Sequence, residues 1–411
     1  MCYEWLKMRF DDRNSRFRGA EFTTIRRLVL SLIVTVGFCG RAAGESSKIL
    51  SLDPIKIGIR EDAKDKSKVT VKEQDAKINL GPVSYSIRHH ARYREGDPAQ
   101  FIATGEYISM PAPTMCNWYH AGFLFLDLNG VCLGKAPISS MTVSETGERG
   151  ILDMVWHHEM ADVRARFLGS PGSDHLLCEI ALDAKRDLTS VKIRLCCYPS
   201  FFTHWYKRAG ARRVQTPAEL ISEGEKATLP PRQGWWAVYY DEVFDIAKGE
   251  GAGPCAMMVS PETVQEICIV TSDDAVNTHI TCLPSVRNIR LAFWDFKGKT
   301  NIEALERVRT GAESLRQTLQ SADFIPSLIA RDAPFFRDKL REVREALADA
   351  DICKLLGERL EKVRNWYNAN QAFEPDSDAF SIRDQEELLQ FLKEFNSFIW
   401  EVRLAELVSR R

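Results

Sequence analysis

The sequence between residues 69 and 300 alternates apolar and polar residues in short runs that are separated by turn residues. Its clearest hairpin is Gly122–Leu128, then Asn129-Gly130, then Val131–Leu133. Alternation with a period of two is typical of β-strands, and Asn-Gly fits a tight turn in which both central residues have positive φ. Because no amphipathic helices interrupt these runs, the pattern argues against a parallel βαβ fold. The sequence predicts a large antiparallel β-sandwich (all-β) over residues 69–300.

Further segments carry the same pattern and predict the other strands. They are Asp153–His158, Ala161–Leu168, Asp174–Leu182, Ser190–Tyr198, Trp235–Phe244, Pro254–Val259, Val264–Thr271, Thr278–Leu283 and Asn288–Phe296. Along Ser190–Tyr198, Lys192 and Arg194 point away from the side of the strand that carries the neighbouring apolar residues.

Near Asn301 the hydrophobic period changes to 3.6, which indicates helices. Asn301 can cap the first of them, with Glu303 in its first turn. Apolar stripes continue to about residue 402, so the sequence predicts an α+β multidomain protein whose residues 301–411 form a C-terminal α-helical bundle. A coiled coil is the alternative, but Pro334 and Pro375 interrupt the pattern.

A leader precedes these regions. Arg26-Arg27 is followed by the apolar run Leu28–Phe38 and by Ala42-Ala43-Gly44, the order of a secretory signal peptide. The run is shorter than the roughly 20 residues that span a bilayer, so we expect no permanent membrane span. A buried helix is the alternative. We predict a signal peptide over residues 1–44, a polar linker or edge segment over 45–68, and an extracytoplasmic (periplasmic or secreted) location.

Composition narrows the class of protein. The hydrophobic content of 45% and charged content of 27% are those of a soluble globular protein, and a net charge of −2 gives no reason to expect nucleic acid as a partner. Of the 11 cysteines, Cys2 and Cys39 lie in the leader, which leaves an odd number in a chain too long to need a disulfide framework. One or two disulfides remain open, without assigned pairs.

The histidines give no metal-binding pattern. All 8 lie between His89 and His279, and neither His-x-x-x-His nor Cys-x-x-Cys occurs. His157 and His158 are adjacent, so on a regular strand they point to opposite faces. Gly-x-Ser-x-Gly, the usual context of a nucleophilic serine, is absent as well. The sequence predicts no metal and no cofactor.

Aromatic residues gather in the predicted strand near residue 240. Alternation divides them into two rows, Trp235, Ala237, Tyr239 and Asp241 on one face and Trp236, Val238, Tyr240 and Glu242 on the other. Aromatic rings stack on sugar faces and carboxylates bind sugar hydroxyls, so one row could form a sugar-binding platform that uses Trp235 or Trp236. The alternative is that both rows are buried between layers.

A second candidate segment follows the strand that ends near Tyr198. It carries His204, Tyr206 and Arg208, and loops beyond a sheet often hold binding residues. We predict His204 and Tyr240 as proton-transfer groups, with Glu242 as their carboxylate partner. Tyr206 and Arg208 are the predicted contacts of an acidic sugar. A solvated basic loop is the alternative.

These features predict an exported β-sandwich protein that binds a carbohydrate. The sequence leaves open whether it is an enzyme; if it is, lyase- or epimerase-type acid–base chemistry is expected. The enzymatic hypothesis rests on analogy with the large β-sandwiches of sugar epimerases and polysaccharide lyases. The alternative function is a non-catalytic cell-envelope scaffold that binds a protein partner through the helical region.

Overall fold

A computed structural model of the chain has two compact units, residues 1–48 and 49–411. The residues described here are 49–61, 68–95, 101–109, 125–133, 138–197, 212–242, 253–272, 275–296, 298–327, 333–357, 359–370, 381–386 and 389–390. The predicted leader lies outside them, so the domain boundaries and the location remain predictions. Among the described helices, none has the length and apolar character of a membrane span.

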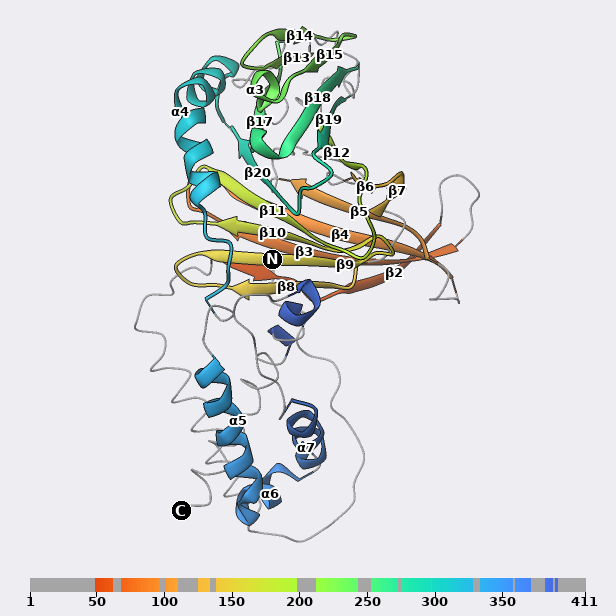
Figure 1. Ribbon diagram of the computed structural model, residues 1–411, viewed down its shortest axis with the longest axis vertical. Helices are drawn as coiled ribbons and strands as arrows, with labels where there is room; N and C mark the ends of the chain where they lie inside the picture. Colours follow the sequence, from red (N-terminus) through yellow and green to blue (C-terminus); the bar gives the residue numbers. More distant parts are fainter. Residues whose placement is uncertain are drawn as a thin grey trace, which may run out of the picture. The chain divides into compact units, whose positions relative to one another are not determined.

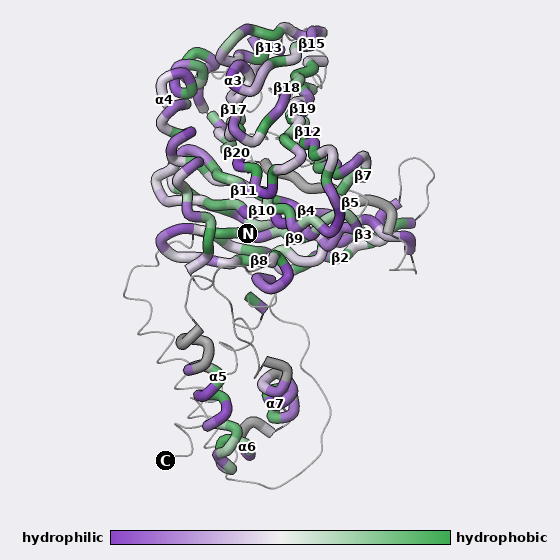
Figure 2. Tube along the Cα trace, in the orientation of Figure 1, coloured by the Kyte–Doolittle hydropathy of each residue, from purple (hydrophilic) through white to green (hydrophobic). Residues whose placement is uncertain are grey.

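A nine-stranded sheet is the largest layer of the molecule (Figure 1). In spatial order it contains β14 (Leu220–Ser222), β13 (Arg212–Gln215), β16 (Trp236–Asp241), β17 (Cys255–Val259), β20 (Asn288–Asp295), β11 (His175–Ala184), β10 (Ala161–Gly169), β9 (Gly150–His157) and β8 (Ser140–Glu145). Each neighbouring pair is antiparallel. Along the strands, hydrophobic and hydrophilic residues change at short intervals, which is the alternation seen in the sequence (Figure 2).

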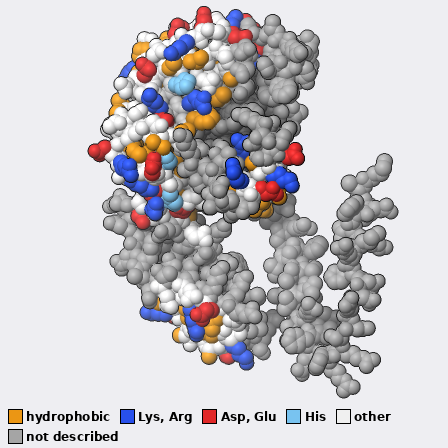
Figure 3. All heavy atoms as spheres, turned by 90° about the vertical axis from the view of Figure 1, so that its right-hand side faces the viewer, with side chains coloured by type: hydrophobic (Ala, Val, Ile, Leu, Met, Phe, Trp, Pro, Cys, Tyr) orange, Lys and Arg blue, Asp and Glu red, His pale blue; other side chains and the backbone are white. Residues whose placement is uncertain are grey.

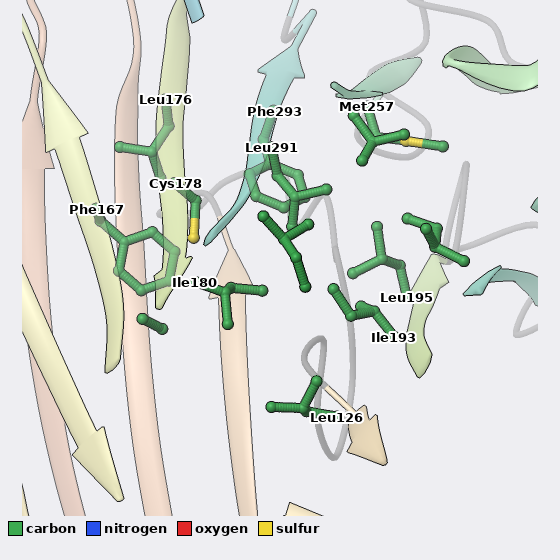
Figure 4. Close-up of a cluster of buried hydrophobic side chains, with 14 of the residues drawn as sticks. Leu126, Phe167, Leu176, Cys178, Ile180, Ile193, Leu195, Met257, Leu291 and Phe293 are labelled. Atoms are coloured by element: carbon green, nitrogen blue, oxygen red, sulfur yellow. The ribbon is translucent and has the colours of Figure 1, made fainter. Parts of the chain in front are cut away.

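A six-stranded antiparallel sheet contributes to the same core. Its order is β15 (Lys226–Leu229), β18 (Val264–Thr271), β19 (Val276–Cys282), β12 (Val191–Cys197), β6 (Phe125–Leu128) and β7 (Val131–Cys132). Asn129 and Gly130 join β6 to β7 with φ of 54° and 83°, which confirms the predicted tight turn. Figure 4 shows Ile193 and Leu195 of β12 in one buried cluster with Met257 of β17 and Leu291 of β20.

A five-stranded sheet completes this core. It contains β1 (Leu50–Leu52), β3 (Lys68–Asn79), β4 (Ser84–Arg94) and β5 (Phe101–Ser109), and β2 (Lys56–Glu61) pairs with β3. A Cβ atom on Gly169 of β10 would lie 2.6 Å from Ile78 Cγ2 and 2.7 Å from Leu80 Cδ2, so this close contact between sheets requires glycine. The antiparallel β prediction is therefore confirmed in the described residues, where each segment predicted as a strand between residues 153 and 296 overlaps an observed strand.

Helix α4 (Asn301–Ser321) packs on the nine-stranded sheet, against β16, β17 and β20. Its N-cap is Thr300 and not the predicted Asn301: the Thr300 hydroxyl accepts a hydrogen bond from the Glu303 amide, and the Glu303 carboxylate accepts one from the Thr300 amide at 2.7 Å. The buried stripe of α4 comprises Ala304, Val308, Ala312, Leu315 and Leu319, which join the apolar cluster on this face of the sheet.

The predicted C-terminal helical bundle is wrong. Its first helix is α4, whose stripe is already buried on the sheet, and the segment 382–386 of its last helix contacts the β-strands through Ile382, Val155 and Ala181. Between them, α5 (Ala333–Ala348), α6 (Ala350–Leu356) and α7 (Arg359–Asn370) contact one another. The described chain is mostly β. The bundle prediction failed because an apolar stripe shows that one side of a helix is buried, but it does not show whether a helix or a sheet buries it.

Candidate functional site

The predicted aromatic platform is buried. All six residues of β16 are buried: Ala237 and Tyr239 face the core between the sheets, and Trp236 and Tyr240 face α4. Trp236 is 6% exposed and Tyr240 8%, so neither ring is open to a ligand. Trp235 ends the short helix α3 (Pro231–Gly234) and is half-buried against the same cluster. The strand was predicted correctly, but its second face is an interior layer.

The proton-transfer roles proposed for this strand have little support from the geometry. Burial, followed by the nearby Glu242 charge, raises the pKa of Tyr240, which keeps its hydroxyl protonated. Glu242 is exposed and accepts a hydrogen bond from Arg213 at 3.1 Å. His204, Tyr206 and Arg208 lie outside the described residues, so their roles remain predictions.

The six-stranded sheet presents a polar face on the side away from the core, called here the outer face. Alternate residues of β12 point inward, and Lys192 and Arg194 point outward, as predicted. The antiparallel register places residues of neighbouring strands beside them in two rows. One row is Phe125, Arg194, His279 and Cys268, and the other is Asp127, Lys192, Thr281 and Glu266.

Arg194 and His279 are the central pair of the first row. The guanidinium of Arg194 lies 3.9 Å from the centre of the Phe125 ring, a cation–π contact that ties it to the neighbouring strand β6. Burial, and then the positive charges of Arg194, Lys226 and Lys192, lower the pKa of His279. At neutral pH its imidazole is therefore uncharged and can accept a hydrogen bond or a proton.

These rows line a shallow pocket of about 380 Å³, within the size range of small-ligand sites. Its lining includes Phe125, Asp127, Lys192, Arg194, His279 and Thr281. Figure 3 shows Lys and Arg side chains around a His side chain in the upper part of the molecule, with hydrophobic atoms beside them. The sequence revealed the polar row of β12 alone; the strand register, which assembles the site, was needed to find the rest.

A second polar cluster joins the end of the described chain to β9 and β10. His157 lies between two carboxylates, with Nδ1 2.8 Å from Asp162 Oδ1 and Nε2 2.9 Å from Glu386 Oε2. Arg383 donates to Asp162 at 2.8 Å, and Lys185 pairs with the same carboxylate at 2.7 Å. Because these charges satisfy one another, the cluster anchors residues 381–386 and does not present a binding surface.

A pocket of about 470 Å³ lies where α4 meets β11. Its carboxylate, Asp174, accepts hydrogen bonds from Arg307 at 2.8 Å and Trp294 at 3.3 Å, and lies 2.9 Å from the Nδ1 atom of His175. Burial raises the pKa of Asp174, but the hydrogen bonds from His175 and Arg307 outweigh it and hold the pKa well below its usual range. This carboxylate ties α4 to the sheet.

In the described part of the chain, no group of three His, Cys, Asp or Glu side chains is placed to hold a metal ion.

Comparisons with known proteins identify no family. No protein-family model matches the chain, and no curated protein matches it. Among solved structures it is weakly similar to the GH36 alpha-galactosidase AgaB from Geobacillus stearothermophilus (TM-score 0.32, 7% identity, 58% of this chain and 41% of that one). It is also similar to the alpha-N-acetylgalactosaminidase NagBb from Bifidobacterium bifidum (TM-score 0.37, 9% identity, 66% of this chain and 42% of that one). The chain spans about two fifths of the length of these enzymes, and likeness at such TM-scores decides nothing about its activity.

Proposed function

We propose that this protein binds a carbohydrate on the outer face of its six-stranded sheet. The observation that carries the proposal is the pocket in which two cross-strand rows bring together an aromatic ring, two cations, a carboxylate and a hydroxyl. Sugars present hydroxyl groups around flat apolar patches, so their sites combine planar groups with hydrogen-bonding side chains. A shallow opening on a sheet suits part of a longer glycan.

The charge of the outer face favours an acidic sugar. Lys192 and Arg194 are adjacent to the single carboxylate of the pocket lining, Asp127, and Lys226 lies close enough to act on His279. A guanidinium in contact with the Phe125 ring carries forked N–H donors, whose geometry matches a carboxylate. The carboxylate of a uronic acid residue would pair with this guanidinium. The hydroxyl groups of the same sugar would form hydrogen bonds with Asp127 and Thr281.

We further propose that the protein is an enzyme, and His279 is the residue that favours this activity. An uncharged imidazole beside cations can remove a proton from the carbon next to a carboxylate while the cations stabilise the developing negative charge. Lyase and epimerase reactions both begin in this way. The alternative scaffold function depended on a C-terminal helical bundle, and no such bundle is evident among the described residues.

A glycan-binding screen of the full chain tests the proposal, with uronate-containing glycans compared with otherwise matched neutral ones. We expect selective binding of the acidic set, weakened about tenfold or more by Arg194→Ala and by Lys192→Ala, because each removes a hydrogen bond to a charged group. Arg309→Ala, on the exposed face of α4, is the matched control and should bind normally. No binding, or equal binding by Arg194→Ala and the control, would refute the assignment.

A further inference from the structure

We propose that Cys197 and Cys255 form a disulfide that covalently joins the two facing sheets. Their Sγ atoms lie 3.2 Å apart in the core, where Cys197 is 1% exposed and Cys255 0%. A disulfide has an S–S distance of about 2.05 Å, so the two sulfur atoms need to approach by roughly 1 Å. Side-chain rotation with a small backbone adjustment supplies a movement of this size.

The position of the two residues suits such a bond. Cys197 is the last residue of β12, paired with Val276 of β19 in the six-stranded sheet. Cys255 is the first residue of β17, between Tyr239 and Asp295 in the nine-stranded sheet. The bond therefore crosses from one sheet to the other where each strand ends, and strand ends adjust more easily than strand centres.

Bond formation is a two-electron oxidation. Each thiol loses a proton, the two sulfur atoms join, and two electrons pass to a second disulfide, which is reduced to two thiols. That oxidant is a small-molecule disulfide or a thiol oxidoreductase of an oxidising compartment, where the predicted leader would bring the chain. The inference is independent of the ligand proposed above.

The bond would also fix the strand at the centre of the outer face. Cys197 lies three residues after Arg194 on β12, and its side chain points into the core while that of Arg194 points outward. Linking β12 to β17 closes a loop between positions 58 residues apart. Closing a loop of this length restricts the unfolded chain and stabilises the folded one.

The experiment equilibrates the purified full chain with mixtures of reduced and oxidised glutathione. Remaining thiols are alkylated after an acid quench, and peptides are identified by mass spectrometry. We expect a linked peptide pair that joins Cys197 to Cys255. It should survive Cys196→Ala, which changes the adjacent outward-facing residue, and Cys178→Ala, which changes another fully buried thiol. It should disappear in Cys197→Ala and in Cys255→Ala.

Thermal unfolding gives a second measurement. Reducing the bond should lower the Tm by on the order of 10 °C, and reductant should not change the Tm of the double variant Cys197→Ala/Cys255→Ala. The peptide measurement on the unchanged protein stands even if a variant does not fold. Complete alkylation of both cysteines under oxidising conditions, or a link that involves Cys196 instead, would overturn the proposal.

Discussion

Strands β16 and β12 both turn one row of side chains toward the core, but they differ in what covers the other row. Each places one row of residues in the core between the sheets and a second row on the other side. On β16 the second row contains Trp236 and Tyr240 and is covered by α4, whereas on β12 it contains Lys192 and Arg194 and lines a pocket. The aromatic row that resembled a binding platform is interior, and the plain charged row is accessible. Aromatic content on a strand therefore indicates burial at least as readily as recognition.

The covering element comes from a distant part of the sequence. The side chain of Asn301, at the start of α4, donates a hydrogen bond to the backbone oxygen of Asp241, 60 residues earlier, at 2.8 Å. Covering an apolar row with such a helix stabilises the fold. Covering an unpaired cation removes its hydration and destabilises the fold. The chemistry of the second row thus selects which strand the helix covers.

The largest effect on stability should come from disrupting the packing of α4 on the sheet. Val308 is fully buried where α4 packs on the sheet, so Val308→Asp places a carboxylate in an apolar layer. We expect the free energy of unfolding to fall by about 4 kcal/mol, measured by urea denaturation. Thr310→Asp, two residues along on the exposed side of α4, should change it by less than about 0.5 kcal/mol. Equal losses would mean that α4 is not held by this face.

Trp236→Ala separates packing from recognition. Truncating this buried ring leaves a cavity under α4, and we expect a loss of roughly 3 kcal/mol in unfolding free energy with unchanged glycan affinity. The half-buried Trp235, changed to Ala, should cost less. A glycan affinity that falls in Trp236→Ala at temperatures where the variant is folded would restore β16 as part of the binding site.

Strand β10 refines the comparison, because its charged second row is covered. Asp162, Arg164 and Arg166 are all buried, and their partners come from neighbouring strands and from residues 381–386. Arg166, for example, holds Asp153 with hydrogen bonds of 2.6 and 2.8 Å. Charges can be covered when the covering segment brings opposite charges and matching hydrogen bonds.

The pH dependence of stability tests that reading. Burial raises the pKa of Asp162, but hydrogen bonds from Arg383, Lys185 and His157 outweigh it and lower the pKa to about 2. Since the folded-state pKa lies below the unfolded one, the stabilisation is present above about pH 4 and is lost as pH falls toward 2. Asp162→Asn should therefore cost roughly 2 kcal/mol at pH 6 and progressively less below pH 4.

The matched control for that measurement is Asp338→Asn on α5, whose side chain is 56% exposed and pairs with Arg341 within one turn. Its effect should stay within about 0.5 kcal/mol across the same pH range. If the cost of Asp162→Asn did not shrink in acid, the ion pairs with residues 381–386 would not be its source.

The smallest effect concerns His279 on the outer face. Its folded-state pKa is lowered, so the unfolded chain binds the proton more readily, and stability should fall slightly as pH drops through the ordinary histidine range near 6.5. His279→Gln should remove this part of the decline, as measured by thermal unfolding between pH 8 and 5. An unchanged decline would show that the neighbouring cations do not act on this ring.

Much of the β architecture could be predicted from local patterns. Alternation located the strands, and Asn129-Gly130 identified its turn because only a few residue pairs accept two positive φ values. The arrangement of those strands could not be predicted in this way. His279 faces Arg194 only through the register between β19 and β12, which are separated in the sequence by β13 to β18.

The errors have the same physical origin. A stripe such as Val308 and Leu315 shows that α4 buries one side, but the same stripe fits another helix or a sheet. Likewise, the sequence around Trp236 is compatible with a ligand contact and with a core residue. Local sequence gives the chemistry of a surface, and only the tertiary fold gives its partner.

The anchor between β10 and residues 381–386 has a consequence for synthesis. Asp162 is bound by Arg383, which lies 221 residues later in the chain. At translation rates of about 5–20 residues per second, the β9–β10 hairpin emerges roughly 10 to 40 s before that arginine. A nascent chain thus carries the hairpin without the ion pair between Asp162 and Arg383, and a chain terminated before Arg383 never acquires it. A segment that is made much later thus completes the β9–β10 hairpin.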